Sequence, residues 1–193
     1  MKLFLLAVLL ATAVAQEIIL AQSDPNTNSV VFPSPNSVII ENFHTQNQGD
    51  KTGYGAKWIW IPSGSNWPHG FTVMFKTKFC APCNRKAKLR MVADNIVKAY
   101  LNGVANADLV GTNTVWNTIA TFYPNLQCGE NTLYFKVTNL HHNSPAGLNY
   151  ALVQDPDACK CPTPFQIWNS QTCSCQSKLK KITQRTPDRF VTP

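Results

Sequence analysis

Apolar and polar residues alternate along the middle of the chain, between Lys57 and Gln154. The stretches that read as strands on this basis are 71–79, 86–91, 115–122, 133–137 and 148–153. A period of two is typical of antiparallel strands with one buried face. No stretch shows the period of a helix. Turn-forming residues separate the strands at intervals of about 8 to 12 residues, which predicts one antiparallel β-sandwich over residues 57–154.

The segment from Met91 to Gly103 holds the strongest turn signals of this region. Asp94 and Asn95 follow an apolar strand, and Asn102-Gly103 follows the next alternating run. Asn-Gly after such a run is a strong hairpin signal, because both residues tolerate positive φ. We therefore expect two tight reversals here, with antiparallel pairing of the strands around them.

The residues before the predicted sandwich divide into two parts. Residues 1–15 carry a lysine and then a short apolar run that ends in Ala13-Val14-Ala15, the pattern of a secretory signal peptide. The run is shorter than the ~20 residues that span a bilayer, so we expect secretion and no membrane span. Residues 16–56 are rich in Asn, Ser and Pro and predict an extended segment. This segment can pair with a sheet edge of its own chain, which we favour, or of a neighbour.

The chain has seven cysteines, which in a secreted protein predict disulfides rather than metal ligands or catalytic thiols. They are Cys80, Cys83, Cys128, Cys159, Cys161, Cys173 and Cys175. We expect a disulfide between Cys128 and the Cys80-Ala-Pro-Cys83 loop. The alternatives are a redox pair of Cys80 with Cys83 and a zinc site formed by these two thiols and two cysteines of the C-terminal extension. The Cys-rich extension 155–177 is too short for a core of its own, and a basic tail, 178–193, follows it. Because the number is odd, one thiol can join a second chain.

The formal net charge is +7, and basic residues gather in 76–90 and in 178–189. A basic surface outside the cell suits acidic polysaccharides, anionic lipid head groups or acidic proteins. The alternation favours a simpler interpretation of the first group, as the solvated faces of strands. We predict no nucleic-acid partner.

The motifs of common catalytic sites are absent from the sequence. It has no Ser nucleophile elbow, no His-Glu-x-x-His and no Gly-rich phosphate loop. A glycosidase needs two carboxylates about 5 to 9.5 Å apart, and Asp94 and Asp108 fall at turns, where Asp bonds to the backbone. His141 and His142 are adjacent, so they point apart in an extended chain. We predict that the protein is not an enzyme and has no cofactor or metal site; structural calcium at the turns cannot be read from the sequence.

Aromatic side chains beside polar turns are the candidate binding residues. Trp67 and His69 lie in a Ser/Gly/Asn/Pro-rich loop, where a tryptophan has no core to enter, and Trp116 lies beside Asn117. Sugar rings stack on exposed aromatic faces, while Asn and His side chains bind hydroxyl groups. These residues form the predicted glycan site. The alternative is that the tryptophans cover the end of the sandwich.

An ordered set of short motifs runs through the predicted sandwich: Trp58-Ile59-Trp60, Ala93-Asp94-Asn95, Tyr100-Leu101-Asn102-Gly103, Gly129-x-Asn131-x-Leu133 and Ala146-Gly147-Leu148. This set resembles the galactose-binding-domain-like modules found as accessory domains of rhamnosidase-type glycoside hydrolases. The resemblance implies an all-β fold, an antiparallel jelly-roll β-sandwich, that binds carbohydrate or serves as an architectural module without catalysis. The Cys80–Cys83 loop and the Cys-rich extension are not part of that pattern.

Together these features predict a secreted, non-enzymatic structural or adhesive protein of an extracellular coat, matrix or filament, with glycan binding through its loops. The expected partners are further copies of the chain, joined by an interchain disulfide or by strand addition from residues 16–56, and acidic or neutral glycans. The alternative is a monomeric, secreted, lectin-like protein that binds carbohydrate through Trp67, His69 and the neighbouring loops.

Overall fold

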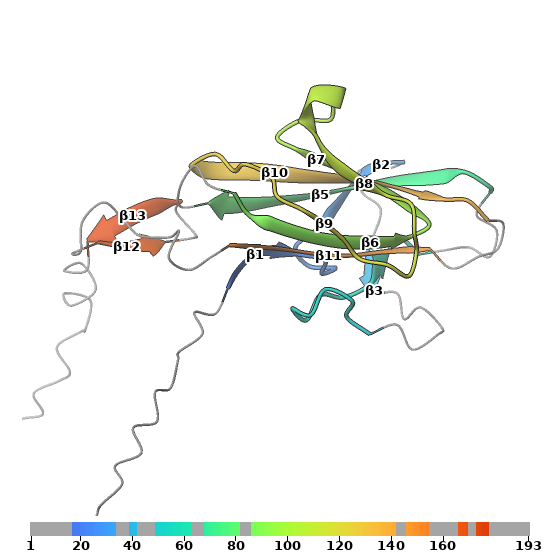
Figure 1. Cartoon of the computed structure of the whole chain (residues 1–193), viewed down its shortest axis with the longest axis horizontal. Helices are drawn as coiled ribbons and strands as arrows, with labels where there is room; N and C mark the ends of the chain where they lie inside the picture. Colours follow the sequence, from blue (N-terminus) through green and yellow to red (C-terminus); the bar gives the residue numbers. More distant parts are fainter. Residues whose placement is uncertain are drawn as a thin grey trace, which may run out of the picture.

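Two antiparallel sheets packed face to face make up the body of the protein (Figure 1). The computed structural model describes residues 17–33, 39–41, 49–62, 68–81, 86–141, 146–154, 166–169 and 173–177. Within these residues it contains strands and one short 3-10 turn, η1 (Asn106–Asp108), and no α-helix. The predicted all-β sandwich is confirmed.

Sheet A has the strand order β3-β4-β11-β6-β9, and β1 pairs with β11 as well. Its strands are β1 (Ile18–Gln22), β3 (Ile40–Glu41), β4 (Ile59–Trp60), β6 (Lys88–Asp94), β9 (Ala120–Phe122) and β11 (Gly147–Gln154). Sheet B has the order β2-β5-β10-β7-β8. Its strands are β2 (Ser29–Phe32), β5 (Phe71–Ala81), β7 (Ile96–Leu101), β8 (Leu109–Asn113) and β10 (Gly129–Asn139).

The extended segment 16–56 supplies strands to both sheets of its own chain. β1 pairs with β11, β2 pairs with β5, and β3 pairs with β4. The two sheets therefore begin at Ile18, well before the predicted start of the sandwich at residue 57. Apolar pieces of this segment, such as Val30, are buried against the sandwich core.

The chain changes sheets at Asp94-Asn95. The expectation of a hairpin at this point is wrong, because β6 pairs with β9 and β11 in sheet A, whereas β7 pairs with β8 and β10 in sheet B. Asn95 fixes this corner by accepting a hydrogen bond from the backbone N–H of Leu140 at 2.7 Å. The chain does reverse after Asn102, which has a φ of 62°, and β7 pairs antiparallel with β8, but the connection spans residues 102–108 and is longer than the tight turn that the sequence predicts.

The core fills the space between the sheets. Along β5 and β10 every second residue is buried, with Phe75 and Phe135 fully enclosed. Phe135 of sheet B meets Tyr150 of sheet A at a ring-centroid distance of 4.1 Å. The alternation seen in the sequence therefore marks the inner face of sheet B, and its polar partners mark the outer face of that sheet.

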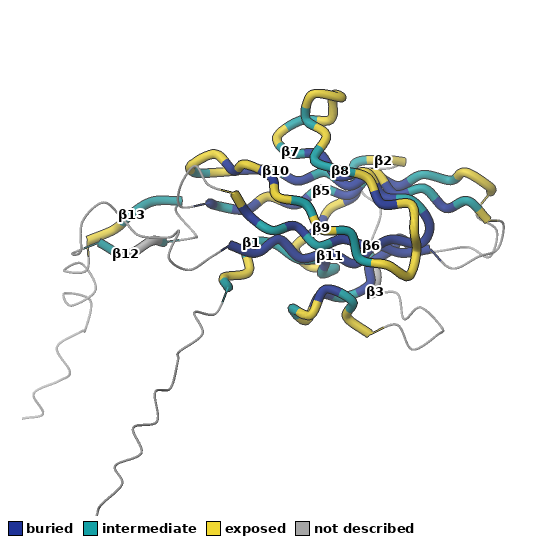
Figure 2. The backbone as a smooth tube through the Cα atoms, in the orientation of Figure 1, coloured by how far each residue is buried: buried dark blue, intermediate teal, exposed yellow. Residues whose placement is uncertain are grey.

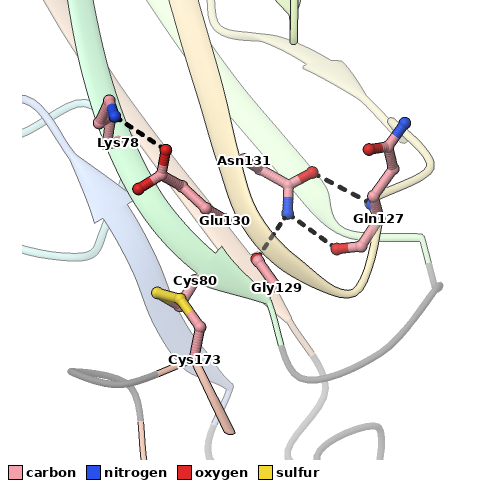
Figure 3. The surroundings of a disulfide bond; sticks show 7 residues. All are labelled: Lys78, Cys80, Gln127, Gly129, Glu130, Asn131 and Cys173. Carbon is pink, nitrogen blue, oxygen red and sulfur yellow. Dashed lines mark hydrogen bonds and ion pairs between the residues drawn. A yellow bond between two sulfur atoms is a disulfide. The ribbon is translucent and has the colours of Figure 1, made fainter.

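A small hairpin follows the sandwich, made of β12 (Gln166–Asn169) and β13 (Ser174–Ser177). A disulfide joins Cys173, directly before β13, to Cys80 near the end of β5, with 5.3 Å between their Cα atoms (Figure 3). This spacing is ordinary for a disulfide. The bond closes a sequence separation of 93 residues and ties the hairpin to sheet B.

The sequence predicts a disulfide between Cys128 and the Cys80–Cys83 loop. For Cys80 this prediction is wrong, because Cys80 is bonded to Cys173. In the β5–β10 ladder Cys80 lies opposite Glu130, on the outer face of sheet B, where Cys173 reaches it. Cys128 is exposed, just before the start of β10. Cys175 is also disulfide-bonded. Cys83, Cys159 and Cys161 lie outside the described residues.

Candidate functional site

Three of the residues predicted to bind glycan lie at one end of the sandwich. His69 precedes β5, while Trp116 and Asn117 lie in the connection from β8 to β9. Strand register places the start of β5, the end of β10, the start of β7 and the end of β8 at this same end. β5 and β8, the strands next to these two loops, are three strand spacings apart in sheet B, roughly 14 Å. Trp67 lies outside the described residues.

The loop that carries Trp116 is held by the buried side chain of Asn113. Its amide donates to the carbonyl of Thr118 at 2.7 Å and to the carbonyl of Met91 at 3.2 Å, and its oxygen accepts the N–H of Val115 at 2.9 Å. These bonds leave Trp116 38% exposed at the tip of the loop. The predicted strand 115–122 is thus a turn followed by the short strand β9.

The outer face of sheet B carries a continuous row of side chains that sequence inspection missed. Strand register aligns one outward residue from each of the five strands in the order Phe32, Met74, Lys136, Lys98 and Thr112. We call these five residues the sheet B row. Both lysines are exposed, and Phe32 is 53% exposed. The row passes from an apolar end, Phe32 and Met74, through the two lysines to Thr112 over four strand spacings, roughly 19 Å.

The apolar end of the sheet B row lines a groove of about 540 Å³. Its walls are Phe32, Gly70, Phe71, Thr72, Met74 and Lys136. Beside it the hydroxyl groups of Thr72 and Thr138 lie 3.0 Å apart on neighbouring strands. The groove therefore offers apolar surface, hydroxyl groups and one ammonium group together, and it begins next to the predicted residue His69.

A second row runs parallel to the first along the same face. Lys76 of β5 lies opposite Tyr134 of β10, which lies opposite Tyr100 of β7. Further along β5, Lys78 forms an ion pair of 2.8 Å with Glu130, as Figure 3 shows. The Glu130 carboxylate raises the pKa of Lys78 by hydrogen bonding. Lys78 is therefore neutralised within the chain, unlike the lysines of the sheet B row.

The carboxylates whose side chains are described are all engaged away from the sheet B row. Glu17 pairs with Lys88, Asp24 with Lys57 and Glu130 with Lys78. Asp50 and Asp108 accept hydrogen bonds from the backbone of their own loops, and Asp94 accepts one from the side chain of Asn95. Among the described residues, no carboxylate pairs with Lys76, Lys98 or Lys136. This face of sheet B therefore presents uncompensated positive charge to solvent.

A smaller groove, of about 390 Å³, opens at the edge where β8 and β9 meet. Leu109 and Tyr123 line it and are 42% and 62% exposed. No lysine or arginine lines this groove. In the described part of the chain, no group of three or more His, Cys, Asp or Glu side chains could hold a metal ion, and no helix is long and apolar enough to cross a membrane.

No protein-family model and no curated protein matches the chain. Among solved structures it is similar to an α-L-rhamnosidase from Streptomyces avermitilis, at 24% identity and a TM-score of 0.43, over 52% of this chain and 10% of that chain. It is also similar to a lectin from Pleurotus ostreatus, at 21% identity and a TM-score of 0.42, over 73% of this chain and 34% of that chain. A family 35 carbohydrate-binding module from Clostridium thermocellum follows, at 12% identity and a TM-score of 0.42, over 70% of this chain and 97% of that chain.

The kinds of protein named by the sequence resemblance, a rhamnosidase and carbohydrate-binding modules, are thus present among these similar structures. The chain spans only a small part of the rhamnosidase and about a third of the lectin. At these TM-scores the similarities carry no argument about function.

Proposed function

We propose that this protein is a secreted, non-enzymatic carbohydrate-binding protein whose ligand lies on the outer face of sheet B. The observation that carries the proposal is the groove between Phe32, Met74 and Lys136, beside the hydroxyl groups of Thr72 and Thr138. Ligand sites combine apolar area with a few placed polar groups. A sugar ring has an apolar face for Phe32 and Met74 and hydroxyl groups for the threonines and the lysine.

The same face supports a binding role rather than a catalytic one. Glycoside hydrolysis requires two carboxyl groups on either side of the bond that is broken. No Asp or Glu lines the groove, and the described carboxylates are engaged elsewhere. The proposal of secretion rests on the predicted signal peptide and on the Cys80–Cys173 disulfide, since disulfides persist in oxidising compartments.

The structural role in a coat, matrix or filament stays a prediction. Strand addition from residues 16–56 to a neighbouring chain is one of the two routes of self-association that the sequence predicts. In the structure, β1 and β2 from this segment pair with β11 and β5 of the same chain. This use of the two strands favours the lectin-like alternative over a subunit that lends strands.

Phe32→Ala is the variant that tests the proposed site, and Tyr123→Ala is its matched control. Both side chains are exposed aromatics, but Tyr123 lies in the other groove, at the β8–β9 edge. Binding of the secreted protein to an array of polysaccharides is measured for each variant. We expect Phe32→Ala to weaken binding by about tenfold, because it removes one stacking contact, and Tyr123→Ala to bind like the wild type.

The predicted loop site is tested on the same array with Trp67→Ala and Trp116→Ala. Loss of binding in either of these variants, with full binding by Phe32→Ala, would place the ligand at the end of the sandwich and overturn the sheet B site. Wild-type protein that binds no polysaccharide would overturn the proposed function.

A further inference from the structure

We infer that the ligand of this face is an acidic polysaccharide, held by the paired lysines Lys98 and Lys136. The inference rests on the proposed carbohydrate-binding function and narrows it to one class of ligand. Its first support is the strand register, which places Lys98 of β7 directly opposite Lys136 of β10. Like charges at directly opposite positions of neighbouring strands destabilise a sheet.

Among the described residues, the two lysines have no acidic partner on their own face. Both are exposed, their neighbours in the sheet B row are Met74 and Thr112, and each described carboxylate is engaged elsewhere. Opposed side chains start about 4.5 to 5.5 Å apart at Cβ. Two flexible lysine side chains at this spacing can both contact one carboxylate or sulfate group. A bound anion would then replace repulsion between the ammonium groups with two charge-assisted hydrogen bonds.

Lys76 extends the positive charge beyond this pair. It lies two strands from Lys98 and two residues further along the sheet, which corresponds to roughly 10 Å across the strands and 7 Å along them. One small anion cannot contact all three lysines at this separation. A polymer that carries an anionic group on successive sugars can, while its rings lie along the groove and the half-buried ring of Tyr134.

The apolar end of the sheet B row favours a polysaccharide over other polyanions. Phe32 and Met74 provide surface for a sugar ring, and Thr72 and Thr138 provide hydroxyl groups beside it. The row is thus divided into a part that suits the uncharged portion of a sugar and a part that suits its acidic substituent. This arrangement gives each half of an acidic sugar a matching partner.

The test uses the full chain and four probes: polygalacturonate, heparin, the neutral polymer dextran, and vesicles that contain phosphatidylserine. Affinity is measured for wild type and for the double variant Lys98→Gln/Lys136→Gln. The control is Lys57→Gln/Lys86→Gln, which removes the same charge from positions away from this face. Thermal unfolding of each variant verifies that it is folded.

We expect wild type to bind polygalacturonate or heparin more tightly than dextran, with affinity that falls as salt is added. The Lys98/Lys136 double variant should lose about tenfold or more in affinity for the acidic polymer, whereas the control variant should lose less than about threefold. Binding to one acidic polymer and not the other would identify the acidic group as carboxylate or sulfate.

Three results would overturn the inference. The first two would leave the proposal of carbohydrate binding in place, and the third would remove it as well. Equal binding to dextran and to the acidic polymers would show a carbohydrate-binding protein that does not select charge. Unchanged affinity of the Lys98/Lys136 variant for the acidic polymer would assign that affinity to other basic residues, such as the tail 178–193. Binding to vesicles alone would identify a membrane-binding face and would reject the proposed function as well.

Discussion

The outer faces of the two sheets have similar sequences but differ in what covers them. On sheet A, Lys88 and Arg90 alternate with buried residues of β6, as Lys76 and Lys98 do on the strands of sheet B. On sheet A, however, the segment 49–58 lies across the outer face, as Figures 1 and 2 show. All eight residues of β11 are buried, the inward ones by the core and the outward ones on the side of this segment.

Specific contacts fasten this cover to sheet A. Trp58 lies against Gly147, where a Cβ atom would come within 2.9 Å of the indole ring. The amide of Asn149 donates to the carbonyl of Ala56 at 2.9 Å and accepts the N–H of Lys51 at 3.2 Å. The Arg90 guanidinium donates to the carbonyl of Thr52. The cations of this face are therefore used inside the molecule.

Among the described residues, the outer face of sheet B has no comparable cover along β5 and β10, although Tyr100 of β7 is buried. Its outward side chains on β5 and β10, such as Met74, Lys136 and Lys78, are half-buried or exposed. The comparison shows that alternation alone does not distinguish an outer face that its own chain covers from one that is open to solvent. The distinction comes from whether polar outward residues find partners within the chain.

Removal of Trp58 should have the largest effect on stability. Trp58 is 5% exposed, and Trp58→Ala should lower the free energy of unfolding by about 3 to 5 kcal/mol through lost burial and a cavity over Gly147. The equivalent change on the outer face of sheet B, Phe32→Ala, should lower the free energy of unfolding by about 1 kcal/mol or less, because half of that side chain is already in water. Urea unfolding measures both. Similar losses of unfolding free energy in the two variants would refute the contrast between the outer faces of sheet A and sheet B.

Loss of the Asn149 side chain should have the next largest effect. Asn149→Ala leaves the carbonyl of Ala56 and the N–H of Lys51 without their partner beneath the cover, which should cost about 1 to 3 kcal/mol. Hydrogen exchange of the backbone amides of residues 49–58 should become faster in this variant. Unchanged exchange there would mean that Asn149 does not fasten the segment.

The ion pair of Glu17 with Lys88 should make a smaller, pH-dependent contribution. Its atoms are 2.6 Å apart, and hydrogen bonds from Lys88 and Tyr54 lower the pKa of Glu17 below its ordinary value of 4.5. Because the pKa is lowered in the folded state, the stabilisation is complete above pH 4.5 and is lost as the pH falls through the folded pKa.

Glu17→Gln tests this contribution. It should lower stability at neutral pH by less than about 1 kcal/mol, since both side chains are partly exposed, and the difference from wild type should shrink in acid. Denaturant unfolding at neutral pH and well below pH 4.5 provides the comparison. A difference that is the same at both pH values would exclude the ion pair as its source.

The smallest expected effect has the opposite sign. Lys98→Gln removes the repulsion between Lys98 and Lys136 and should raise the free energy of unfolding by up to about 0.5 kcal/mol in the absence of ligand. The same variant should bind acidic polymer more weakly. A loss of stability in the unliganded variant would show that Lys98 has a supporting role in the fold.

The fold class could be predicted because the inner face of sheet B follows strict alternation. The assignment of strands to sheets could not. Asp94-Asn95 has the turn residues of a hairpin, but local turn signals do not state whether the next strand pairs with the last one or enters the opposite sheet. The strand β8 was missed because Gly111 breaks the alternation of apolar and polar residues along it. Glycine is needed here, since a Cβ atom at this position would lie 2.2 Å from the ring of Phe122.

The candidate site could be predicted less well for a related reason. Each lysine of the sheet B row occupies an outward position that alternation identifies, but Lys98 and Lys136 become neighbours only through the pairing of β7 with β10. Phe32 joins them from the far edge of the sheet through β2. Composition drew attention instead to Trp116, which the structure places at an exposed position in the connection from β8 to β9.

The most direct test of the account is to map the binding surface by nuclear magnetic resonance. Backbone amide shifts of the labelled protein are followed during titration with an oligosaccharide of polygalacturonate. The account predicts that the shifted amides cluster around Phe32, Met74, Lys98 and Lys136 on strands β2, β5, β7 and β10, with little change in segment 49–58. Shifts confined to the loops around His69 and Trp116, or to the tail 178–193, would contradict it.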